Sequence, residues 1–227
     1  MTGLKSKETV SREVAYAVID QVSRKPSSLF GLPTGRTPKS LYGYIKEITE
    51  KERIDWSRAR FFGLDEYLNT SPEKTFQFYL KKNIYTPLKV GAEQCFNPLY
   101  LDNYDEVIDS LGGLDLTILG IGANGHIAFN EPPTPELSWT HCIWLSDSTR
   151  EANQEFFESS ASVPKRAVTM GIQTLLSSRK IILMAFGKNK KAILTKSLTG
   201  PVDSSIPASF LQLHRNLEVY TDFEFTV

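Results

Sequence analysis

Residues 114–121, with the sequence LDLTILGI, constrain the fold of this chain more than any other segment. Their apolar side chains run almost without interruption and end in glycines, as in a strand that is buried on both faces of a sheet. Shorter apolar runs at 28–32, 59–64 and 181–185 are separated by segments with helical periodicity, of which 6–24 is the clearest. Strands that alternate with helices predict an α/β fold with a central, mostly parallel sheet.

Further elements follow from the same periodicities. We expect helices at 38–50, 76–84, 151–158 and after Gly187, and a final strand at 217–220. The 227 residues contain no linker, internal repeat or low-complexity segment. A chain of this length is enough for one well-buried core, so the sequence predicts a single domain over residues 1–227.

Composition argues against several classes of function. Lys and Arg together number 26, as do Asp and Glu, so the basic excess that is typical of nucleic-acid-binding proteins is absent. No stretch approaches the roughly 20 apolar residues that cross a bilayer, and no signal-peptide core is present. Cys95 and Cys142 are isolated, which favours free thiols in a reducing compartment. We therefore expect a cytoplasmic protein that binds neither nucleic acid nor membrane.

Four unusual motifs follow predicted strands, at the edge of a parallel sheet where ligands bind. The first is residues 32–38, LPTGRTP, which joins a strand to a helix through a glycine turn. Backbone N–H groups, the helix dipole and the hydroxyls of Thr34 and Thr37 would together favour an anion. A purely structural turn is the alternative. The motif is neither a P-loop nor GxGxxG, so it predicts no dinucleotide.

The second motif is the pair Asp65 and Glu66, directly after an apolar strand. Successive side chains diverge, so we expect only one carboxylate to face a ligand pocket. In the alternative interpretation, Asp65 is the N-cap of a helix.

The third motif, GIGANGHIAFNEP at 120–132, combines three glycines with His126 and Glu131. A carboxylate near a histidine can orient the imidazole for proton transfer, although an isolated histidine can also be structural. No other histidine or cysteine stands at zinc-ligand spacing, so no metal is expected. The fourth motif follows Gly187, where a lysine could reach a phosphate or could simply begin a solvated helix.

Together, LPTGRTP, LDEY, GIGANGHIAFNEP and IPASFLQLH (206–214) resemble the glucosamine-6-phosphate deaminase family, in order, from about residue 29 to 220. The resemblance implies a modified Rossmann-like, three-layer α/β fold without a cofactor. It also implies conversion of a hexosamine 6-phosphate to a ketose 6-phosphate and ammonia, glucosamine 6-phosphate being the first candidate substrate.

Site residues follow from the same resemblance. Asp65 resembles the carboxylate that moves a proton from C2 to C1 through a cis-enolamine, and His126 the residue that assists ring opening. Glu131 would hold and charge that histidine, with Asn124 in support.

The phosphate cradle would consist of four residues: Thr34, Gly35, Thr37 and Lys190. Lys191 is the reserve candidate for the lysine.

Three positions depart from the family pattern. Asn124 stands where the best-known hexameric members have a third acid, and Glu155 where they have a phosphate-binding arginine. Arg36 replaces a glycine of the usual TGGTP and could supply the missing cation. Other features, including the pair Thr75-Phe76, resemble the galactosamine-6-phosphate branch.

Two other functions remain open. A 6-phosphogluconolactonase shares the TGxTP turn and a strand-end DE pair, but Tyr67 and GHIAFNEP argue against it. A non-catalytic sugar-phosphate sensor is the second alternative, for which Asn124 and Glu155 are the support. Basic residues that allosteric members use are missing from 132–144, so we expect a monomer or a small homo-oligomer.

Overall fold

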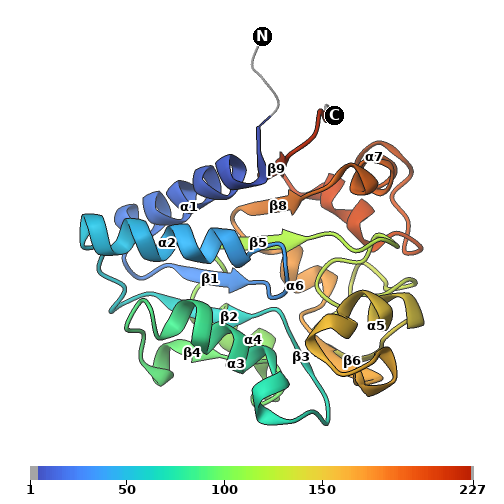
Figure 1. The fold of residues 1–227 in the computed structure, drawn as a ribbon, viewed down its shortest axis with the longest axis horizontal. Helices are drawn as coiled ribbons and strands as arrows, with labels where there is room; N and C mark the ends of the chain where they lie inside the picture. The colour runs from blue at the N-terminus through green and yellow to red at the C-terminus, as the bar shows by residue number, and fades with distance from the viewer. Residues whose placement is uncertain (1–4, 226–227) are drawn as a thin grey trace.

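A computed structural model describes residues 5–225. Its main sheet has six strands in the order β4-β2-β1-β5-β8-β9, and every pairing is parallel (Figure 1). The strands are β1 (Leu29–Leu32), β2 (Arg60–Gly63), β4 (Cys95–Phe96), β5 (Leu116–Gly120), β8 (Ile181–Ala185) and β9 (Leu217–Thr221). The predicted α/β fold with a central, mostly parallel sheet is confirmed.

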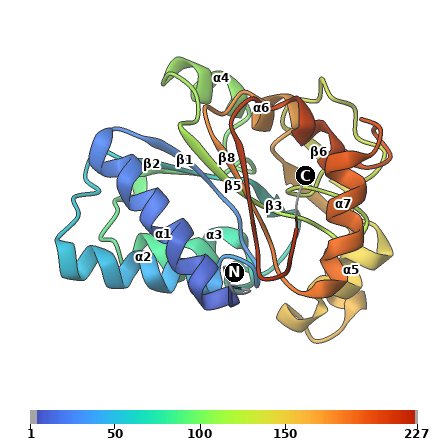
Figure 2. The same cartoon turned by 90° about the horizontal axis from the view of Figure 1, so that it is seen from above.

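Helices cover both faces of this sheet (Figures 1 and 2). One face packs against α1 (Lys7–Arg24) and α2 (Lys39–Glu52), and the other against α4 (Tyr104–Ser110), α6 (Ile172–Leu176) and α7 (Lys191–Thr199). Along β8, Ile182 and Met184 join the first core while Ile181 and Leu183 join the second. Burial on both faces therefore explains the unbroken apolar runs. No helix within residues 5–225 combines the length and the apolar character that crossing a bilayer requires.

Local signals explain where α1 begins and where α2 ends. Ser6 accepts a hydrogen bond from the Thr9 N–H, and α1 then buries a valine stripe, as predicted for 6–24. Helix α2 ends at Glu52, and its C-cap, Arg53, has a left-handed φ of 55°.

Two predicted helices differ from the structure. The predicted helix 76–84 is α3 (Phe76–Leu80) followed by a π-helical turn, Lys81–Tyr85. The helix predicted at 151–158 was misplaced, because Ser146 caps an earlier start by accepting from the Thr149 N–H. Helix α5 therefore spans Asp147–Asn153, and a 3₁₀ turn, Gln154–Phe156, follows it.

A second sheet, which the sequence analysis did not predict, lies beyond the carboxyl edge of the first (Figure 1). It is antiparallel, in the order β3-β7-β6, and consists of β3 (Asp65–Tyr67), β7 (Arg166–Thr169) and β6 (His141–Trp144). Only Leu64 separates β2 from β3, so the chain passes directly from one sheet to the other.

The buried carboxylate of Glu66 fixes β3 in place. Its Oε1 accepts hydrogen bonds from the N–H groups of Tyr67 (2.9 Å) and Phe76 (2.8 Å). Its Oε2 accepts from the Gln77 N–H (2.8 Å) and from Asn97 Nδ2 (2.9 Å). Two of these donors belong to the first turn of α3, whose dipole also favours a negative charge. Glu66 is therefore the structural member of the acidic pair.

We predict that Glu66→Gln lowers the free energy of unfolding by about 3 kcal/mol, because an amide NH₂ would face N–H donors in a buried site. Chemical denaturation measures the change. Glu47→Gln, at an exposed position of α2, is the matched control and should change stability by less than about 0.5 kcal/mol. Equal stabilities of the two variants would contradict this role.

Candidate active site

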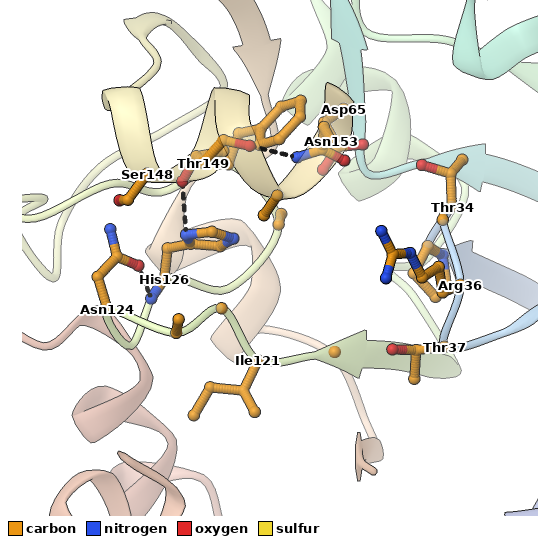
Figure 3. Close-up of a pocket in the computed structure, with 18 of the residues that line it drawn as sticks. Thr34, Arg36, Thr37, Asp65, Ile121, Asn124, His126, Ser148, Thr149 and Asn153 are labelled. Carbon is orange, nitrogen blue, oxygen red and sulfur yellow. Dashed lines mark hydrogen bonds between the residues drawn. The ribbon is translucent and has the colours of Figure 1, made fainter. Parts of the chain in front are cut away.

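A cavity of about 670 Å³ opens at the carboxyl ends of β1, β2 and β5 (Figure 3). Its walls are the turn 33–37, Asp65 on β3, the glycine loop 120–126, residues 189–190 after Gly187, and the segment formed by α5 and the following 3₁₀ turn. All four sequence motifs therefore contribute to one pocket. Of the predicted site residues, only Glu131 lies behind the wall and not on it.

The turn after β1 has the geometry of an anion site. Gly35 has a φ of 87°, and its carbonyl accepts a hydrogen bond from the Tyr79 hydroxyl at 2.7 Å. Helix α2 begins directly afterwards, and Pro38 at its N-cap offers no side-chain acceptor. The N–H groups of its first turn are thus available to a ligand. Thr34 and Thr37 line the pocket here (Figure 3).

Three cationic side chains surround this turn. Lys190 lines the pocket and donates to the Ile121 carbonyl at 2.9 Å, and burial lowers its pKa. Arg36 forms an ion pair with Glu155. Lys7, which the sequence analysis missed, donates to the Arg36 carbonyl at 3.4 Å. Lys191, the reserve candidate, is exposed and does not line the pocket.

Asp65 lies in strand β3, so it is not the N-cap of a helix. Its side chain faces the pocket while Glu66 faces α3, as the divergence of neighbouring side chains predicts. Only 7% of Asp65 is exposed. Burial, and then the charge of Glu66, raise its pKa to about 8. A carboxyl group with such a pKa can both accept and donate a proton near neutral pH.

His126 occupies the other side of the cavity from Arg36 (Figure 3). Its Nδ1 lies 3.3 Å from Thr149 Oγ1 and 3.8 Å from Glu131 Oε2. Burial lowers its pKa, Glu131 opposes that shift, and Lys190 adds to it. The net shift favours the neutral imidazole, which has a ring nitrogen able to accept a proton.

Glu131 sits at the centre of a small polar network. Its Oε2 accepts from Asn124 Nδ2 at 2.7 Å, and its Oε1 accepts from the Ser146 hydroxyl at 3.1 Å. Ser146 in turn caps α5, which carries Thr149. Helix α5 and its cap are thus tied to the histidine and its carboxylate.

Three pocket residues lie on α5 and were not predicted from the sequence: Ser148, Thr149 and Asn153. Only the serine-rich start SDST gave a signal, as a possible helix cap. Lys7 gave none, because nothing in α1 indicates that its first turn lies beside the turn after β1.

A model of the family described as glucosamine-6-phosphate isomerases/6-phosphogluconolactonase matches residues 5–220. The chain belongs to this family. Within it, the protein named glucosamine-6-phosphate deaminase from Lachnoclostridium phytofermentans is 41% identical and aligns over 95% of both chains. The protein of the same name from Clostridium botulinum is 39% identical, over 96% of this chain and 93% of its own.

Solved structures of the family share the fold. A monomeric glucosamine-6-phosphate deaminase superposes with a TM-score of 0.92 at 36% identity, over 96% of this chain and 94% of its own. The 6-phosphogluconolactonase of Plasmodium vivax reaches a TM-score of 0.72 at 22% identity, over 96% of this chain and 87% of its own. The second likeness concerns the fold alone.

We predict that Gly122→Ala displaces the His126 ring, because a Cβ at this position would lie 2.3–2.5 Å from the ring atoms. The variant should lose about 1–3 kcal/mol of stability and shift the imidazole ¹⁵N resonances of His126. The chain has three histidines, so the signals are few.

Gly120→Ala is the control, since its Cβ would meet Thr37 at 3.7 Å, an ordinary contact. It should leave the His126 resonances in place. Unshifted resonances in Gly122→Ala would show that the ring does not depend on the bare backbone at Gly122.

Proposed function

We propose that this protein is a glucosamine-6-phosphate deaminase, which converts glucosamine 6-phosphate and water to fructose 6-phosphate and ammonia. The observation that carries the proposal is a buried carboxyl group, Asp65, with a pKa raised to about 8 in a pocket whose other end is an anion site. Relatives with this name, about 40% identical over nearly the whole chain, support it. Proton transfer on a phosphorylated sugar needs this combination.

The 6-phosphate would bind at the turn after β1. Backbone N–H groups of Gly35 and of the first turn of α2, with the Thr34 and Thr37 hydroxyls, would donate to its oxygens. Arg36 and Lys190 would balance its charge. Binding at this remote group fixes the sugar carbons between His126 and Asp65 and supplies energy for orienting them.

Ring opening would use His126. A neutral imidazole can accept the proton of the C1 hydroxyl as the bond between C1 and the ring oxygen breaks, and can then protonate that oxygen. Glu131, 3.8 Å away, stabilises the imidazolium that forms in between. Asn124 holds Glu131 in place but cannot itself carry a charge.

Isomerisation would use Asp65. Its carboxylate removes the C2 proton of the open-chain amino aldose while the substrate's ammonium group gives a proton to the C1 oxygen, which yields an enolamine. Asp65 then delivers its proton to C1. The product is a protonated imine at C2, which takes up water and releases ammonia as ammonium. The substrate's ammonium group beside Asp65 favours the carboxylate form when the sugar binds. Each of these steps moves protons or water, so the proposed chemistry calls for no cofactor.

We further propose that the chain forms a single domain and acts in the cytoplasm as a monomer or a small homo-oligomer. A monomeric deaminase with nearly the same fold supports the simplest of these states.

We predict turnover of glucosamine 6-phosphate, measured as released ammonia and fructose 6-phosphate, that falls about 10³-fold in Asp65→Asn. Galactosamine 6-phosphate is assayed in parallel, because Phe76, from the pair that resembles the galactosamine branch, lines the pocket. Asp102→Asn, at an exposed position outside the cavity, is the control and should retain full activity. Absence of turnover of both sugars by a folded protein that binds phosphate would contradict an enzymatic role in deamination.

The raised pKa of Asp65 also predicts how stability depends on pH. The folded state holds this proton up to about pH 8 and the unfolded state releases it near 3.8, so stability falls as pH rises between these values. Asparagine mimics the protonated acid and avoids this loss. As the pH rises from 5 to 7, the free energy of unfolding of Asp65→Asn should therefore rise by about 3 kcal/mol relative to that of the wild type, measured by urea unfolding. A constant difference across this range would contradict the raised pKa.

A further inference from the structure

An ion pair crosses the phosphate end of the cavity. Arg36, on the turn after β1, donates through Nε to the Glu155 carboxylate, on the 3₁₀ turn that follows α5. The two residues are 119 positions apart in sequence and both line the pocket. Their side chains are 66% and 39% exposed. Two of the three positions that depart from the family pattern thus meet in space.

Arg36 cannot donate its Nε–H to two anions at once. The Nε of arginine is part of the planar fork that binds carboxylates and phosphates, and Glu155 already occupies it. A phosphate bound at Gly35 and the α2 N-terminus would lie beside the same guanidinium, because Arg36 directly follows Gly35 in the turn. The carboxylate and the phosphate are therefore competitors.

We propose that Glu155 is a built-in counter-ion that occupies Arg36 in the empty pocket and is displaced by the phosphate group of the ligand. Glu155 then sets how tightly the pocket binds phosphate, although it takes no part in the chemistry. The identity of the ligand as a sugar phosphate rests on the proposed function, but the competition concerns any phosphate.

The energetics of the pair suit this role. Exposed ion pairs contribute little to stability, since water screens them, so a dianion that also binds Lys190 and backbone N–H groups can displace Glu155. The competition weakens the binding of every anion at Arg36. The loss is the same for inorganic phosphate and for a sugar phosphate, so their relative affinity does not change. Both dissociation constants rise, and a sugar phosphate, which also contacts the rest of the cavity, still binds at concentrations at which inorganic phosphate does not.

The test is calorimetric titration of inorganic phosphate into the full chain and four variants. Glu155→Gln should bind phosphate about two- to fivefold more tightly than the wild type. Glu151→Gln is the matched control. Glu151 lies on α5, just before the 3₁₀ turn that carries Glu155, and lines the same pocket, and it forms no ion pair within residues 5–225. It removes the same charge and should change phosphate affinity by less than Glu155→Gln does.

Arg36→Gln and the double variant Arg36→Gln/Glu155→Gln complete a cycle that isolates the pair. Arg36→Gln should weaken phosphate binding, and removing Glu155 should then give no further gain. Circular dichroism verifies that each variant is folded.

Three results would overturn the inference: unchanged or weaker phosphate binding by Glu155→Gln, an equal gain in Glu151→Gln, or an equal gain when Arg36 is absent. Phosphate binding requires no turnover, so the two proposals fail separately. If the protein is an active deaminase but Glu155→Gln does not bind phosphate more tightly, the proposed function stands and this inference is wrong. If the protein is inactive but Glu155→Gln does bind phosphate more tightly, this inference stands and the proposed function is wrong.

Discussion

The hydrogen bonds to Glu66 are the interaction on which the rest of the site depends. Four donors hold this carboxylate, and two of them are N–H groups at the start of α3, so β3 cannot rotate or slip. Because side chains alternate along a strand, fixing Glu66 on one side forces Asp65 into the pocket on the other. Asp65 is buried, accepts no comparable hydrogen bonds within residues 5–225 and lies beside the negative charge of Glu66. Burial first, and then that charge, raise its pKa. Two adjacent acids thus acquire opposite roles from their surroundings.

The cavity has two chemically different ends because two sheets build it. The carboxyl edge of the parallel sheet supplies the turn 33–37, with its N–H groups and cations. The second sheet holds Asp65 in place, and α5 contacts His126 through Thr149. Burying Asp65 with no ion-pair partner within residues 5–225 lowers the stability of the fold at neutral pH. The proposed proton transfer needs this burial, so the function explains the lower stability.

Much of this could be predicted from the sequence. Unbroken apolar runs gave the parallel sheet, and parallel strands place their carboxyl ends at one edge, so motifs 30 to 150 residues apart were expected to meet. The second sheet was missed because its strands are only three or four residues long and β6 is nowhere fully buried. Glu155 and Arg36 were each recognised as unusual, but a sequence cannot show that two side chains so far apart form an ion pair. The position of Lys7 beside the turn is likewise a result of how α1 packs.

The most direct test of this view of the site is the titration of Asp65 itself. Infrared difference spectra between the wild type and Asp65→Asn isolate the stretching band of a single carboxyl group as the pH is varied. We expect the band of the protonated acid at pH 7 and its loss with a midpoint at about pH 8. If Asp65 is instead already a carboxylate at pH 6, its burial beside Glu66 does not set its chemistry, and the central claim is wrong.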